Sequence, residues 1–219
     1  MKKLFVIHTS DVSLDYLKTL FQKIIPEVQV YNIVDDSLLD EIMKNNCVTK
    51  SVAARFCTYA LQAQYSGADL ILSQCSSAGP AADIASRIVD VPVLKIDQAM
   101  AEEAVTRGSR IAVIGTVSST MLPSTELIRS VAREKGLSVE VTPYLVDGAL
   151  DILMKENNRQ KHNHLILEQI RAVTDCSDVV VFAQGSMVSV LDDLGDTKIP
   201  VLTSPEIGVR RARKELGLP

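Results

Sequence analysis

The chain has 219 residues, of which 47% are hydrophobic and 23% are charged, so it is long enough for one or two globular domains with a sizeable core. Its formal net charge of −4 provides no basic surface for nucleic acid or for an anionic membrane. No apolar run approaches the roughly 18 residues that span a bilayer. We therefore expect a soluble globular protein that binds neither nucleic acid nor membrane.

In the first half of the chain, short runs rich in Val, Ile and Leu alternate with stretches whose apolar residues have helical spacing. The short runs predict strands at residues 3–7, 28–34, 70–73 and 91–96. The intervening stretches predict helices at residues 13–25, 37–44, 51–66, 79–90 and 100–106. The first run has the basic start of a signal peptide but is too short for one, so we expect it to be a strand.

The second half repeats this alternation. Strands are predicted at residues 111–114, 138–141, 179–182 and 201–202. Helices are predicted from near Pro123 and at residues 148–156, 164–174, 188–194 and 205–216. The last helix has no strand of its own, so we expect it to pack against the first half. Alternating strands and helices predict an α/β fold, in which helices cover both faces of parallel sheets and ligands bind beyond the carboxyl ends of the strands.

Segments of the first half recur in the second half in the same order, at offsets that drift only between 107 and 112. The matched segments are 3–10 with 110–117, 34–35 with 146–147, 67–77 with 176–186, and 91–94 with 199–202. Such a repeat indicates a duplication. It predicts two similar lobes, one made of residues 1–97 and 205–219 and the other of residues 98–204. The duplication pairs Cys75 with Gln184, which we expect on opposite walls of one cleft.

The four cysteines, Cys47, Cys57, Cys75 and Cys176, show no C-x-x-C or other metal-ligand spacing, so no metal site is predicted. Without a secretory signal, we expect reduced thiols in a cytoplasmic protein. Cys75 stands between a predicted strand and a predicted helix. The positive end of a helix dipole would lower the pKa of its thiol and make it reactive near neutral pH. The alternative is that Cys75 is a small buried core residue, as most free cysteines are.

Hydroxyl side chains gather just after the predicted strands. They are Ser10, Ser76, Ser77, Thr116, Ser118, Ser119 and Ser186. With the N–H groups of helix starts they suit a carboxylate ligand, although Ser and Thr often serve only as helix caps. Lys95 and His8 also end predicted strands. Lys95 is a candidate for holding an acidic substrate group or a solvated surface lysine, and His8 is a candidate base, ligand or structural polar residue. His162 and His164 lie in a polar stretch and are expected at the surface.

Three motifs resemble those of the cofactor-independent aspartate/glutamate/hydantoin racemase superfamily. Ser-Gln-Cys-Ser-Ser at 73–77 is similar to the family's first Cys-Asn-Thr-like motif. Ile-Gly-Thr at 114–116, with Ser119, is similar to its Gly-Thr-x-x-Thr motif. Ala-Gln-Gly-Ser-Met at 183–187 resembles the Gly-Cys-Ala-Gly-Met motif of hydantoin racemases. The resemblance spans nearly the whole chain and implies two Rossmann-like lobes, pseudo-symmetric, with the active site between them and no cofactor.

The resemblance also implies a small carboxylate or amino-acid substrate and a homodimer or higher homo-oligomer. In two-cysteine members, one thiolate removes the α-proton and the other thiol protonates the opposite face. Cys75 matches the first cysteine, whereas Gln184 occupies the second position, and an amide does not exchange protons at neutral pH. The residues that would contact the substrate carboxylate are Ser10, Ser76, Ser77, Thr116, Ser119, Gly185 and Ser186.

Three functions remain open. The first is an amino-acid racemase in which Cys75 is the acid or base. The second is a one-cysteine reaction. It would be either a decarboxylation like that of the arylmalonate decarboxylases, or an isomerisation like that of the maleate isomerases with Cys75 as the nucleophile. The third is a protein that binds a small carboxylate without catalysis.

Overall fold

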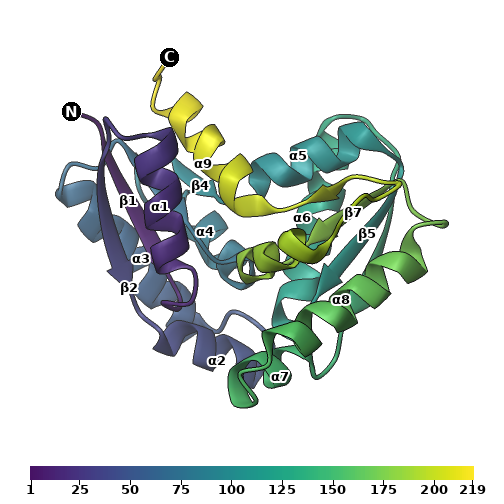
Figure 1. The fold of residues 1–219 in the computed structure, drawn as a ribbon. Coiled ribbons are helices and arrows are strands. Elements are labelled where there is room, and N and C mark those ends of the chain that lie inside the picture. Colours follow the sequence, from purple (N-terminus) through teal and green to yellow (C-terminus); the bar gives the residue numbers. More distant parts are fainter. The chain divides into compact units, whose positions relative to one another are not determined.

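The computed structural model describes residues 1–219, and the contacts within it divide the chain into two units. Unit 1 consists of Met1–Ala99 and Pro205–Pro219, and unit 2 consists of Met100–Ser204. Each unit contains one four-stranded parallel sheet flanked by helices (Figure 1), so the predicted α/β fold class is confirmed. No helix combines the length and the apolar character that crossing a membrane requires.

The sheet of unit 1 has the strand order β2-β1-β3-β4. Its strands are β1 (Lys3–His8), β2 (Gln29–Val34), β3 (Leu70–Ser73) and β4 (Val93–Lys95). Its helices are α1 (Leu14–Ile24), α2 (Ser37–Asn45), α3 (Lys50–Tyr65), the short 3₁₀ helix η1 (Ser76–Ala78), α4 (Gly79–Ala85) and most of α9 (Ser204–Glu215). All neighbouring strands are parallel, and Leu4 of β1 lies opposite both Val30 and Leu70.

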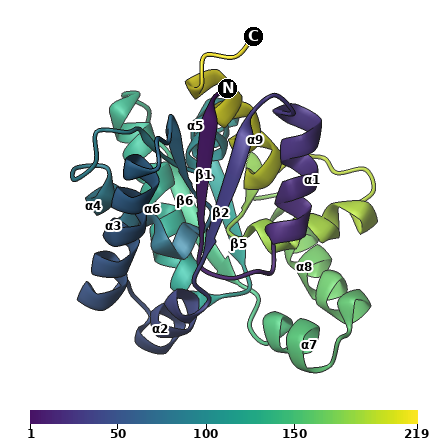
Figure 2. The same ribbon diagram turned by 90° about the vertical axis from the view of Figure 1, so that its left-hand side faces the viewer.

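Helices cover both faces of the unit 1 sheet. Leu4 and Val6 of β1 pack with α1 and α9 on one face, and Phe5 and Ile7 pack with α2, α3 and α4 on the other. Figure 2 shows α3 and α4 on one side of β1 and β2, with α1 and α9 on the other side. Successive side chains of a strand point to opposite faces, so a strand that is buried on both faces is a continuous apolar run. The expectation that the last helix packs against the first half is confirmed.

The sheet of unit 2 has the equivalent order β6-β5-β7-β8. Its strands are β5 (Arg110–Gly115), β6 (Glu140–Leu145), β7 (Val179–Phe182) and β8 (Val201–Leu202). The helices of this half are α5 (Gln98–Arg107), α6 (Ser118–Glu134), α7 (Ala149–Lys155), α8 (Arg159–Val173) and the 3₁₀ helix η2 (Gly185–Asp193). The core on one face joins Ala112 and Ile114 of β5 to α8 and η2.

The sequence repeat corresponds to a repeated pattern of hydrogen bonds. The Asp69 carboxylate accepts the backbone N–H of Lys3 at 2.8 Å, and its counterpart Asp178 accepts the N–H of Arg110 at 2.9 Å. In both units, the aspartate thereby ties the start of the third strand to the start of the first. The repeat therefore reflects a shared way of building the sheet and not only a shared composition.

Several element boundaries differ from the predictions. The helix expected at residues 79–90 is the shorter α4, and the strand expected at 138–141 is β6. Helix α6 begins at Ser118, five residues before the expected start, and contains Pro123. Proline removes one backbone donor from a helix, but here this loss does not end it. The helix expected at 188–194 is the 3₁₀ helix η2.

The prediction that His162 lies at the surface is wrong. Helix α8 begins at Arg159 instead of residue 164, which places His162 on its buried face, where only 2% of the residue is exposed. The His162 ring bonds the Asn163 side chain at 2.9 Å, and Asn163 donates to Asp193 of η2 at 2.6 Å. His164 is exposed, as expected.

Candidate active site

Cys75 lies two residues after the end of β3, at the carboxyl end of the unit 1 sheet. It is the residue that precedes η1, and its backbone is extended, with φ −111° and ψ 121°. The side chain is half-buried and packs against the core cluster on the α3 and α4 face. Cys75 is therefore neither sealed in the core nor freely exposed.

The polar groups around Cys75 have opposing effects on its thiol. Burial raises the pKa of Cys75, and the charge of Asp97 raises it further. The Thr9 side chain and the backbone N–H groups of Ala78 and Ser77 act in the opposite direction. Burial is the largest of these effects, so the expectation of a lowered pKa is wrong. These three donors do not compensate for the cost of removing a thiolate from water.

Asp97 and Lys95 lie at the end of β4, close to the Cys75 loop. The Asp97 residue is 4% exposed, and burial raises the pKa of its carboxyl, while a hydrogen bond from the Ser76 side chain lowers it. The Lys95 ammonium pairs with the Asp83 carboxylate of α4 at 2.7 Å. Lys95 is half-buried, and its ammonium is already paired with an acid of its own unit.

The two residues that end the first strand region point to different faces of the sheet. His8 is fully buried on the α1 face, where its Nε2 bonds Asn32 Oδ1 at 2.9 Å, and burial lowers its pKa. Thr9 is also buried, and it lies on the side of Cys75. Its hydroxyl makes no hydrogen bond of standard geometry, and its interaction with the sulfur lowers the pKa of Cys75. Ser10, the next residue, is half-buried.

Gln184 occupies in unit 2 the position that Cys75 occupies in unit 1. It precedes η2, with φ −128° and ψ 138°. Its Oε1 accepts the backbone N–H of Thr116 at 2.9 Å and the Thr116 hydroxyl at 3.4 Å, and its Nε2 donates to the Thr120 hydroxyl. The amide of Gln184 therefore ties the end of β7 to the segment that connects β5 with α6.

Gly115 makes room for this arrangement. A Cβ atom at this position would lie 2.5 Å from the Met121 sulfur and 3.1 Å from the Gln184 nitrogen. Only a residue without a side chain fits there without displacing these groups. The glycine of the Ile-Gly-Thr segment is thus explained by close packing at the end of β5.

The remaining predicted residues of unit 2 lie at the same end of its sheet. Thr116 and Ser119 are buried, with 7% and 4% of their surface exposed. Gly185 and Ser186 are half-buried and form the start of η2. Hydrogen bonds join Gln184 to Thr116, and chain continuity places Gly185 and Ser186 next to them.

Comparison with known proteins adds to this geometry. A sequence profile of the Asp/Glu/Hydantoin racemase family matches residues 9–212. The chain belongs to this racemase family. A search of curated proteins gave no match.

Solved structures of other proteins share the racemase fold of this chain. An aspartate racemase homologue from Pyrococcus horikoshii is 21% identical, with a TM-score of 0.73 and coverage of 99% of this chain and 100% of that chain. The aspartate racemase of Picrophilus torridus is 15% identical, with a TM-score of 0.71 and coverage of 99% and 95%. Allantoin racemase from Klebsiella pneumoniae is 14% identical, with a TM-score of 0.70 and coverage of 100% and 89%. At these identities the likeness shows the fold alone.

Three residues of this racemase-family chain were missed at the sequence level. Thr9 contacts Cys75, and its signal was the repeat itself, which pairs Thr9 with Thr116. Thr120 bonds Gln184, and its signal was the spacing of four residues from Thr116 at the start of a helix. Asp97 had no signal beyond its place at a strand end, because its burial and its hydrogen bond with Ser76 arise only from tertiary packing.

Cys75 belongs to unit 1 and Gln184 to unit 2. The expectation that these two residues of the racemase-family chain flank one cleft stays a prediction.

Proposed function

We propose that this chain is an enzyme that acts at the carbon next to a carboxylate, with Cys75 as its proton-transferring group. The observation that supports this most is the setting of Cys75. A half-buried thiol lies at a strand end beside the Thr9 hydroxyl and the N–H groups of Ser77 and Ala78. Hydrogen-bond donors beside the sulfur favour the negative charge of the thiolate that remains once Cys75 has given its proton to carbon.

The other roles follow from the residues that surround the two strand ends. Ser10, Ser76 and Ser77 of unit 1 would bind the substrate carboxylate. Thr116, Ser119, Gly185 and Ser186 would do so from unit 2. Gln184 would contact substrate or support Thr116, and it would not exchange protons, because an amide does not ionise near neutral pH.

Proton donation by Cys75 is favoured over proton removal. Burial raises the pKa of Cys75, so its resting form at neutral pH is the thiol and not the thiolate. A thiol is a general acid, and an anionic intermediate is the partner it protonates. This favours a one-sided reaction in which a carboxylate leaves as CO₂, its bonding electron pair forms an enediolate, and the Cys75 proton goes to the carbon. Water then returns a proton to the thiolate.

Deuterium exchange at the α-carbon is the test of the proposal. The protein is incubated in D₂O with amino acids, hydroxy acids and dicarboxylates, and mass spectrometry measures deuterium at Cα. Loss of CO₂ from 2-substituted malonates is measured in parallel. We expect either exchange or decarboxylation with at least one compound class, and its loss in Cys75→Ser but not in Cys47→Ser, which alters an exposed thiol.

Binding of a carboxylate with no exchange and no decarboxylation would support the alternative, a carboxylate-binding protein. A thermal-shift screen with the same compounds separates this outcome from a failure to bind. A ligand at about 100 times its dissociation constant adds about 2.7 kcal/mol to the free energy of unfolding. If the protein neither binds nor turns over any of these compounds, both functions are overturned.

A further inference from the structure

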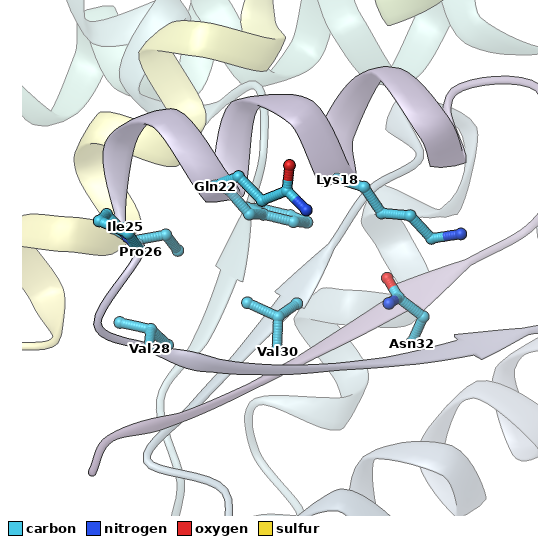
Figure 3. A pocket seen from close by; sticks show the side chains of 8 residues that line it. Lys18, Gln22, Ile25, Pro26, Val28, Val30 and Asn32 are labelled. Atoms are coloured by element: carbon cyan, nitrogen blue, oxygen red, sulfur yellow. The ribbon is translucent and has the colours of Figure 1, made fainter.

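A pocket of about 310 Å³ lies between α1 and β2 in unit 1, away from the residues assigned to proton transfer (Figure 3). This volume is near the lower end of the range of about 300–1,000 Å³ that is typical of small-molecule sites. Helix α1, the turn that follows it and β2 supply the lining. All three belong to one unit, so the pocket is complete within it.

The pocket has a polar end and an apolar end. Figure 3 shows Lys18 and Asn32 at one end, Gln22 and Val30 in the middle, and Ile25, Pro26 and Val28 at the other end. No acidic side chain is among the lining residues. The only charge in the lining is therefore the positive charge of Lys18, which favours an anion.

His8 determines which part of the Asn32 amide is available. The Asn32 Oδ1 is bonded to His8 Nε2, and because this oxygen only accepts, the ring nitrogen is the donor. The NH₂ group of Asn32 is not bonded to His8 and can donate to a ligand. The other His8 ring nitrogen, Nδ1, is buried and has no hydrogen-bond partner. The bond to His8 holds the Asn32 side chain in place. A ligand in the pocket would therefore meet two kinds of donor, the Asn32 NH₂ group and the Lys18 ammonium.

Lys18 is available for a ligand despite its ion pair. Its Nζ lies 3.3 Å from the Asp15 carboxylate, but Asp15 is 96% exposed, and such surface pairs contribute little in water. A carboxylate that bonds both Lys18 and Asn32 competes well with a solvated aspartate, because charge-assisted bonds to two donors are stronger than one.

From this arrangement we infer that the pocket between α1 and β2 binds a small monocarboxylate with an apolar chain or ring. The carboxylate bonds Lys18 and Asn32, and the apolar part lies against Val30, Pro26 and Phe21. This inference does not depend on the proposed function of Cys75. It assigns a second ligand site to the same unit.

The three histidines of the chain provide a direct readout. NMR with selectively labelled histidine is recorded at about pH 8, where His8 is neutral, during titration with hexanoate. We expect the His8 signal to shift and saturate, with a dissociation constant on the order of 1 mM. His162 and His164 belong to unit 2 and serve as internal references. Acetate, which lacks the apolar chain, and hexanamide, which lacks the charge, should both bind more weakly.

Matched variants locate the binding site. Lys18→Met keeps the apolar part of the side chain and the helix propensity, and should weaken hexanoate binding about tenfold. Lys23→Met removes the same charge from the same helix at a residue that does not line the pocket, and should leave binding unchanged. Equal affinity of wild type and Lys18→Met, acetate binding as tight as hexanoate binding, or no His8 shift would each overturn the inference.

Covalent modification of Cys75 distinguishes hexanoate binding in the pocket from hexanoate binding near the thiol. In a variant whose other three cysteines are replaced by alanine, carboxymethylation of Cys75 introduces a carboxylate there and should leave the hexanoate titration of His8 unchanged. Loss of the His8 shift after this modification would assign the probe to the Cys75 loop and overturn the pocket assignment. The absence of turnover in the deuterium experiment would not alter either result.

Discussion

The loop after β3 and the loop after β7 have nearly the same backbone but different side-chain environments. Cys75 and Gln184 both precede a 3₁₀ helix, with φ and ψ of −111° and 121° in one and −128° and 138° in the other. The Gln184 amide is held by Thr116 and Thr120, whereas the Cys75 sulfur has only the weak partners that surround a half-buried thiol. The two loops share their backbone conformation, but only the loop of unit 1 carries an ionisable side chain at this position.

The threonine that follows the first strand of each unit illustrates the same difference. Thr116 bonds Gln184 through both its backbone N–H and its hydroxyl, so this threonine supports a neighbouring side chain. Its counterpart Thr9 has a buried hydroxyl directed to the Cys75 sulfur and no standard hydrogen bond. In unit 2 the polar groups satisfy one another. In unit 1 the buried Thr9 hydroxyl lacks such a partner.

The largest effect is expected from removing the thiol. Cys75→Ser should lower any turnover by about 10²- to 10⁴-fold, because a serine hydroxyl is a far weaker acid than a thiol. The measurement is deuterium exchange or CO₂ release with the compound that wild type turns over. Cys47→Ser is the control. Activity of Cys75→Ser near that of wild type would show that the two loops do not differ in the way described.

The next largest effect concerns the hydrogen bonds of Gln184. Gln184→Ala leaves the Thr116 N–H without its acceptor and should lower the free energy of unfolding by about 1–3 kcal/mol, as measured by urea denaturation. Gln184→Glu retains an acceptor for this N–H and should cost less. Equal stability of all three proteins would mean that the Gln184 amide does not support the β5–α6 segment.

Gln184→Cys makes the two loops alike. Cysteine is smaller than glutamine, but it also loses the bonds to Thr116 and Thr120, so we expect a stability loss close to that of Gln184→Ala. The variant should gain racemisation of a carboxylate that wild type binds, because it restores a second group able to exchange protons. Chiral chromatography of the product detects this gain. Racemisation by wild type at a rate typical of enzymes would contradict the role given to Gln184.

A smaller effect is expected in the pH dependence of alkylation. Only the thiolate reacts with iodoacetamide, and burial raises the pKa of Cys75 above its usual 9.0. Raising the pH converts thiol to thiolate, so the alkylation rate of Cys75 should still be rising at pH values above 9.0. At neutral pH, Cys75 should react more slowly than exposed Cys47. Peptide mass spectrometry resolves the two sites, and faster labelling of Cys75 at neutral pH would favour the helix-dipole effect over burial.

The smallest effect should come from Asp97. Its charge raises the pKa of Cys75, so Asp97→Asn should move the alkylation profile of Cys75 to lower pH. Asp83→Asn alters an exposed acid that pairs with Lys95, and should leave the profile nearly unchanged. An identical profile in wild type and Asp97→Asn would show that the charge of Asp97 does not affect the pKa of Cys75.

Much of the fold was predictable because it depends on local sequence patterns. Strands that are buried on both faces require continuous apolar runs, and such runs identified β1, β3, β5 and β7 in the sequence. The repeat predicted two similar lobes, and the two sheets have equivalent strand orders because matching segments such as 67–77 and 176–186 form the same turns and bonds. The position of Cys75 at a strand end followed from the same local pattern.

Other features were decided by tertiary structure. The direction of the Cys75 pKa shift depends on the balance between burial and a few donors from β1 and η1, which no local pattern reports. The burial of His162 depends on where α8 begins and on its contact with η2. The role of Gln184 depends on Thr116 and Thr120, which are 68 and 64 residues away in sequence. Local sequence specifies which element a residue belongs to, whereas burial and partners arise only when distant segments pack together.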